Sequence, residues 1–144
     1  MRRWFCALGL FMALACGDEE SEPQVVSEEV RAQAPDACQP YGADAEVFGY
    51  CMVDQVSGMK TPETAADLCS LAGEWEGRCR HRWVSIQRVD ATTHATEILL
   101  EFCGEDSECA FELLEFRVDP DLQTQIGRCT AHTGEHVEDC LGHA

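Results

Sequence analysis

The stretch TPETAADLCSLAGEWEGRCRHRWVSI, residues 61–86, decides the fold class of this chain. It opens with threonine, proline and glutamate, which are typical of the N-cap, the first position and the first turn of a helix. Apolar residues then recur every three or four positions, as they do along one face of an α-helix. We therefore predict one long amphipathic helix here, with an inward face made of Leu68, Ala72, Trp75, Cys79, Trp83 and Ile86.

The same periodicity predicts helices outward from this stretch. A second helix is expected over 93–103, with Gly104 as its stop. A third is expected to begin after Asp106 or Ser107, and the Asp119-Pro120-Asp121 run repeats the cap-and-proline start before a last helix that reaches Cys140. The inward residues of these helices are predicted to be Ile98, Leu99, Phe102, Ala110, Phe111, Leu113, Leu114, Leu122, Ile126, Cys129, Thr133 and Val137.

The stretch 38–51 is expected to be a loop plus a short helix. The fold class predicted from these patterns is all-α, a small disulfide-stapled bundle of four or five helices after a disordered acidic tether.

The first residues of the chain are typical of an export signal. Two arginines are followed by an apolar run over 4–14 and by the small-residue box Ala13-Leu14-Ala15-Cys16. The run is too short to cross a bilayer as a helix, which needs about 20 apolar residues. We predict a signal peptide over 1–15.

The box resembles that of bacterial lipoprotein precursors, which are cleaved just before the cysteine. The resemblance implies that Cys16 carries a diacylglycerol and anchors the protein to a membrane of the cell envelope, at its periplasmic or outer face. Cleavage nearby by an ordinary signal peptidase is the alternative.

A tether is predicted between this anchor and the folded part. Residues 17–36 hold seven acidic residues, one arginine and no aromatic residue, a composition that favours disorder. The predicted organisation is a lipidated Cys16 with a disordered acidic linker over 16–36, and a cysteine-rich helical domain over 37–144.

Charge limits the partners that this protein can have. The chain has 27 acidic and 10 basic residues and a formal net charge of −17. Proteins that bind nucleic acid neutralise phosphates with lysine and arginine, so this balance excludes nucleic acid as a partner.

Ten cysteines indicate an oxidising compartment. Cys6 is expected to leave with the signal peptide, and Cys16 is expected to be lipidated. The remaining eight predict four disulfides, for which 105 pairings are possible. No Cys-x-x-Cys occurs, so the usual zinc, thioredoxin-type and c-type haem motifs are absent from the sequence. The predicted disulfide cysteines are Cys38, Cys51, Cys69, Cys79, Cys103, Cys109, Cys129 and Cys140.

A faint internal repeat relates two cysteine pairs. In both 69–79 and 129–140, a Gly-Glu pair lies six residues before the second cysteine. If each segment is one continuous helix, its cysteines are separated by about 15 Å of rise, well beyond the roughly 7 Å that a disulfide spans. This predicts that neither pair bonds to itself and that each helix is bridged to other elements.

A second resemblance rests on residues 69–84, CSLAGEWEGRCRHRWV, and on CAFE at 109–112. These runs are similar to uncharacterised cysteine-rich lipoproteins found in large Gram-negative genomes. Since that group has no assigned activity, the resemblance implies none for this chain.

The cluster closest to chemistry lies near the C-terminus. His132, His136, Asp139 and His143 are spaced by four, three and four residues, so on one helix they would share a face. Such a set could bind zinc, nickel or copper. Residues 132–136 also spell the H-x-x-E-H motif of inverted zinc peptidases, although few residues remain for a further ligand. A solvated polar face is the alternative.

Other candidates give weaker signals. The basic residues of 78–88 could contact an anionic partner or offset the protein's own charge. Trp75 and Trp83 are expected in the core rather than in a carbohydrate platform. Ser85 lacks any serine-hydrolase motif.

The sequence therefore predicts a non-catalytic binding or structural module of the cell envelope, anchored through Cys16, with an unknown envelope protein or ligand as partner and no cofactor. The alternative function is a metal-binding or metal-dependent envelope protein that holds zinc at the histidine face.

Overall fold

The computed structural model describes residues 24–90 and 92–143, and this part of the chain consists of helices and turns without strands. The predicted all-α, disulfide-stapled fold is confirmed. The α-helices are α1 (Glu28–Gln33), α2 (Ala45–Gln55), α3 (Pro62–Ser70), α4 (Glu76–Gln87), α5 (Thr96–Cys103), α6 (Ser107–Phe116), α7 (Leu122–His132) and α8 (Val137–Gly142), and the 3-10 helices are η1 (Gln39–Tyr41), η2 (Val56–Gly58), η3 (Gly73–Trp75) and η4 (Gly134–His136).

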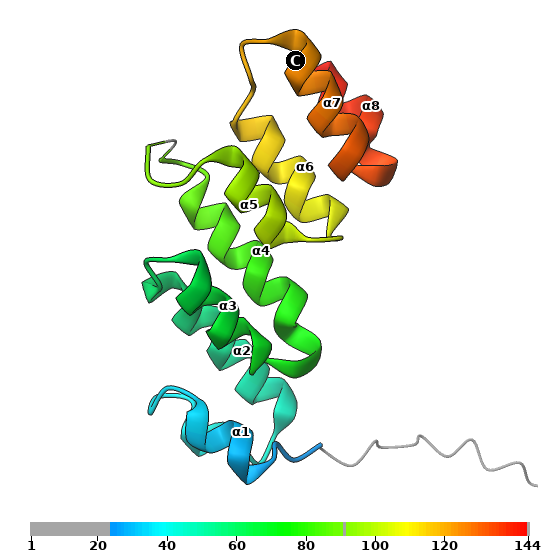
Figure 1. The fold of residues 1–144 in the computed structure, drawn as a ribbon. Helices are drawn as coiled ribbons and strands as arrows, with labels where there is room; N and C mark the ends of the chain where they lie inside the picture. Colours follow the sequence, from blue (N-terminus) through cyan, green and yellow to red (C-terminus); the bar gives the residue numbers. More distant parts are fainter. Residues whose placement is uncertain (1–23, 91, 144) are drawn as a thin grey trace, which may run out of the picture.

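The helices form four consecutive hairpins that stack along one axis (Figure 1). Helices α1, α3 and α5 begin at residues 28, 62 and 96, and so repeat every 34 residues. The second helices of the hairpins contact one another in order, α2 with α4, α4 with α6 and α6 with α8. Each hairpin therefore packs mainly on its neighbours, as in helical repeat proteins.

Each hairpin is closed by one disulfide, which joins a cysteine to the next cysteine along the chain. All four pairs have Cα atoms 5.4–5.8 Å apart, within the usual range of bridged cysteines. The pairs are Cys38–Cys51, Cys69–Cys79, Cys103–Cys109 and Cys129–Cys140.

The prediction that the 69–79 and 129–140 pairs cannot close on themselves is wrong. It assumed continuous helices, whereas the chain turns back between the cysteines of both pairs. Gly73 and Gly134 adopt φ of 61° and 51° in these corners, and Gly104 adopts φ of 62° between α5 and α6. A glycine is needed there because other residues are strained at positive φ. The repeated Gly-Glu pair thus marks a corner, and the breaks increase the number of helices beyond four or five.

Local capping explains several boundaries. The hydroxyl of Thr61 accepts a hydrogen bond from the Thr64 N–H, with Pro62 at the first helical position, as predicted. Asp106 caps α6 and Gly104 ends α5, also as predicted. In the last third it is Asp121 that caps α7, so Pro120 lies before the helix rather than inside it. The stretch 38–51, expected to be a loop plus a short helix, contains η1 and then the first part of α2, which Asp44 caps and which continues to Gln55.

The predicted disordered linker is wrong for residues 24–36. Ser27 caps α1, and Val26, Val30 and Ala34 lie four residues apart and pack against the core. The Val26 N–H also donates to the Gly42 carbonyl at 2.9 Å. The burial of these three apolar side chains offsets the entropy lost when the segment becomes ordered. The acidic composition had suggested that too little apolar surface was available for this. The rest of that linker and the whole signal peptide lie outside the described residues.

The core runs along the stack and is centred on Trp83, which is fully buried and donates from its indole N–H to the Met59 carbonyl at 3.1 Å. Two predicted core residues are instead exposed: Ile98 at 43% and Leu122 at 54%. Both lie on the first helices of hairpins, which diverge more than the second helices. Within residues 24–90 and 92–143, no helix has the length and apolar character to cross a bilayer.

Arg117 fixes the connection between the second and third hairpins. Its side chain is 8% exposed and donates to the carbonyls of Gln87, Arg88, Asp90 and His94 at 2.5–3.1 Å. These carbonyls belong to the C-terminal end of α4 and to the loop after it, where helix geometry leaves carbonyl groups short of donors. Those of Gln87 and Asp90 also accept long backbone hydrogen bonds of 3.3 Å, from the N–H groups of Asp90 and Thr93. A single cation therefore satisfies four backbone acceptors and holds the loop in place.

Candidate binding groove

A groove of about 680 Å³ lies between α3 and α5, and we consider it the best candidate for a functional site. It falls within the size range of ligand-binding hollows. Its walls come from the first helices of two successive hairpins, and α4 and the loop before α5 close its base. The lining residues are Thr61, Pro62, Glu63, Ala66, Arg80, His94, Ile98, Glu101 and Phe102.

The floor of the groove is apolar and rigid. Phe102 is 6% exposed, and its ring packs against the ring of the buried Trp83, with centroids 4.6 Å apart. Ile98, one helical turn earlier on α5, leaves 43% of its surface open. Pro62 and Ala66 have the same four-residue spacing on the opposite wall. Two short apolar ridges thus face each other across the groove.

The rim is acidic. Among the described residues, neither Glu63 nor Glu101 forms an ion pair. Hydrogen bonds from the Glu63 backbone N–H and from the Thr61 hydroxyl hold the pKa of Glu63 below its usual value. The one arginine of the groove, Arg80, is already paired with Glu76 at 2.8 Å. The groove therefore has unbalanced negative charge around an apolar floor.

His94 contributes a polar atom without a partner. Its Nε2 is buried and has no hydrogen bond within the described part of the chain, although its ring lies 5.3 Å from that of Trp83. Buried polar atoms in native proteins are nearly always hydrogen-bonded, but Trp75 Nε1, away from the groove, is unsatisfied in the same way. Because the His94 nitrogen is shielded from solvent, it is not open to a ligand in the groove.

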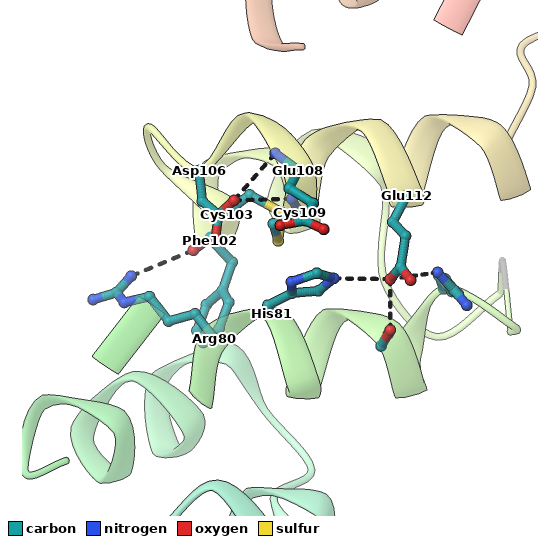
Figure 2. Close-up of a disulfide and its surroundings, with 10 residues drawn as sticks. Arg80, His81, Phe102, Cys103, Asp106, Glu108, Cys109 and Glu112 are labelled. Carbon is teal, nitrogen blue, oxygen red and sulfur yellow. Dashed lines mark hydrogen bonds and ion pairs between the residues drawn. A yellow bond between two sulfur atoms is a disulfide. The ribbon is translucent and has the colours of Figure 1, made fainter. Parts of the chain in front are cut away.

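Beside the groove, α4 and α6 are joined through one carboxylate (Figure 2). His81 and Ser85 of α4 and Arg88, its C-cap, all reach the same Glu112 oxygen, at 2.9, 2.7 and 2.5 Å. Burial alone would raise the pKa of Glu112, but hydrogen bonds from Ser85 and His81 and the charge of Arg88 outweigh it and hold the pKa below its ordinary value. We call these four residues the Glu112 cluster.

The Glu112 cluster was not foreseen from the sequence, where His81 lies one helical turn before Ser85 but no acid-and-histidine arrangement was recognised. The fold brings the Glu112 carboxylate to both, but the arrangement is not that of a serine hydrolase. Ser85 donates directly to the carboxylate, whereas an activated serine needs to donate to the histidine. The cluster ties two helices together next to the Cys103–Cys109 disulfide (Figure 2).

The predicted histidine face does not form. It required one helix over 132–143, whereas α7 ends at His132 and the chain turns at η4. The ring of His136 stacks on Phe111 with centroids 5.3 Å apart, and His143 lies 3.4 Å from Glu115. Among the described residues, no three His, Cys, Asp or Glu side chains are grouped to hold a metal ion. The positions of His132, His136, Asp139 and His143 thus give no support to a zinc site.

The basic residues mostly serve inside the fold. Arg80 and Arg88 are paired with carboxylates, and Arg88 also lies 4.1 Å from the ring of Phe116. Arg78 stacks over Trp75 of η3 and over Tyr50, which lies exposed on α2. Trp83 is in the core as predicted, whereas Trp75 is only half-buried and packs into the space left by Gly49.

Sequence patterns gave only a weak pointer to the groove. Ile98 fits the apolar face of a helix, so it was predicted to lie in the core. The packing of α3 beside α5 depends on the turns between the helices, which the sequence pattern did not reveal. Glu63 and Glu101 of the rim also did not stand out in the sequence, because acidic residues are frequent along the whole chain. Cys16, the predicted lipid anchor, lies outside the described residues.

No protein-family model matches the chain, and no significant match was found among curated proteins or solved structures.

Proposed function

We propose that this protein is a non-catalytic binding module of the bacterial cell envelope, anchored by a lipid on Cys16. The observation that carries the binding role is the α3–α5 groove, which combines an apolar floor with acidic groups that form no ion pair among the described residues. Exposed apolar surface next to unpaired polar groups is typical of a recognition surface.

The architecture supports durable display of this groove. Each wall belongs to a hairpin closed by its own disulfide, Cys69–Cys79 for α3 and Cys103–Cys109 for α5. The Arg117 hydrogen bonds and the Glu112 cluster then fix one hairpin on the next. A surface that is rigid before binding loses little conformational entropy when a partner docks.

The anchor determines how the stack would stand on the membrane. Gln24 and His143 lie at opposite ends of the stack (Figure 1). At most eight residues, Cys16 to Pro23, separate the lipid from Gln24, a reach of no more than about 29 Å even when fully extended. In this arrangement the first hairpin would lie nearest to the membrane, and the groove would lie farther out.

The anchor is tested by the intact mass of the protein recovered from membranes, with Cys16→Ser as the control. We expect the mass of a diacylglycerol-modified chain that begins at Cys16, and release of the Cys16→Ser variant from the membrane. An unlipidated mature protein would overturn the anchor.

The binding role is tested by placing a photoreactive amino acid at position 98 in cells that make the protein. Position 122, which is similarly exposed but lies outside the groove, is the matched control. We expect one defined crosslinked product from position 98 and none from position 122. Equal crosslinking at both positions, or none at position 98, would overturn the groove as the binding surface.

A further inference from the structure

We propose that the occupant of the α3–α5 groove is a basic amphipathic helix of another protein. This inference rests on the proposed binding function and names the class of partner that the groove fits. The apolar floor, the acidic rim and the lack of backbone groups along the walls each restrict the occupant.

The floor selects an apolar helix face. Ile98 and Phe102 on one wall and Pro62 and Ala66 on the other are each four residues apart, so the apolar ridges run along the helix axes. Side chains at positions i, i+3, i+4 and i+7 of an incoming helix can pack between such ridges. The exposed part of Ile98 would be covered by this contact.

The walls disfavour an extended peptide. Both are made of helices, so apart from first-turn N–H groups such as those of Glu63 and Ile98, their backbone N–H and C=O groups are bonded within the helix. The backbone N–H and C=O groups of an extended segment would lose their hydrogen bonds to water here and find few partners in the walls. Each group left unpaired would cost free energy. A helix brings its own backbone hydrogen bonds and needs only side-chain contacts.

The rim selects cations on the flanks of that helix. Glu63 and Glu101 lie on opposite walls, and Arg80 is neutralised by Glu76. Residues 37–144 contain 20 acidic and 7 basic residues, so the long-range field of the molecule also attracts a basic segment.

The experiment uses a fluorescent, end-capped model peptide with leucine at helical spacing and lysine on both flanks. Its binding to the purified, disulfide-intact protein is measured by anisotropy at about 0.15 M salt, where distant surface charges are largely screened. Ile98→Asp and the double variant Glu63→Gln/Glu101→Gln are each expected to weaken binding about tenfold or more.

Matched variants separate the groove from general charge attraction. Leu122→Asp places the same new charge at an exposed leucine outside the groove, and Glu74→Gln/Glu138→Gln removes two exposed carboxylates elsewhere. Both are expected to bind the peptide as the unmodified protein does. Equal losses in the groove variants and in these controls would overturn the proposal.

Two further peptides test the chemistry of the occupant. A version with glutamate in place of lysine is expected not to bind, and a version with two central prolines, which cannot form the helix, is expected to bind at least about tenfold more weakly. Equal binding of either one would overturn the basic or the helical part of the proposal. Crosslinking at position 98 without binding of the basic peptide would refute this occupant and leave the proposed binding function standing.

Discussion

Gly73 and Gly77 provide a matched pair of substitutions that test the central feature of the fold, the corner between α3 and α4. Gly73 has φ of 61°, whereas Gly77 lies in the first turn of α4. A Cβ atom built on either residue meets nothing within 4 Å. Replacement by alanine therefore tests the backbone conformation alone, without steric clash.

The two substitutions are expected to have opposite signs. Alanine in the left-handed region costs about 1–2 kcal/mol, of which about 0.4–1 kcal/mol is regained because the unfolded chain becomes less flexible. Gly73→Ala should thus destabilise the protein by about 1 kcal/mol. Gly77→Ala should stabilise it by about 0.5 kcal/mol, since alanine is the better helix former. The difference of about 1.5 kcal/mol corresponds to about 6 °C in Tm for a domain of this size.

Urea denaturation with intact disulfides, followed by helical circular dichroism, measures both values. If the 61–86 stretch were one continuous helix, both substitutions would stabilise the protein to a similar degree. That result would refute the corner and, with it, the Cys69–Cys79 pairing.

Three other perturbations test the contacts between hairpins. Arg117→Met removes a donor from four backbone carbonyls, of which those of Arg88 and His94 have no other donor among the described residues, and is expected to cost about 3 kcal/mol in urea denaturation. Arg82→Met at an exposed position of α4 is expected to cost less than about 0.5 kcal/mol. Glu112→Gln tests pH dependence: because the folded pKa of Glu112 lies below its ordinary value of 4.5, its contribution to stability is present above pH 4.5 and lost as pH falls through the folded pKa. The stability difference between the variant and the unmodified protein should therefore shrink in acid, and a pH-independent difference would contradict the assignment. Cys38→Ser/Cys51→Ser opens a loop of 13 residues, which predicts a loss of about 3 kcal/mol and faster hydrogen exchange in α1 before the other hairpins.

Local chemistry made much of the helical structure predictable. Thr61, Asp106 and Gly104 act as caps and stops within a few residues of themselves, so their roles follow from their immediate neighbours. The count of eight cysteines after the predicted signal peptide and Cys16 likewise predicted four bridges, and four are found.

The pairing of these cysteines was decided by backbone geometry that the apolar period did not reveal. Apolar residues continue at helical spacing through 72–75 and 133–137, so periodicity alone predicts one continuous helix in each place. The corners at Gly73 and Gly134 divide each of these into two helices. Each corner brings two cysteines ten or eleven residues apart within bonding distance. For residues 24–36 the prediction failed for a different reason. It relied on the acidic composition and did not weigh the few apolar residues that pack against the core.

The sequence by itself determined the helical class, the caps and the number of bridges, because these depend on interactions within a few residues or on simple counts. Only the tertiary structure decided that the hairpins stack, that Ile98 lines a groove instead of the core, and that Ser85, His81 and Arg88 meet at Glu112. These features join residues roughly 25 to 40 positions apart. They depend on the direction in which each corner sends the next helix, and no local pattern in the chain specifies that direction.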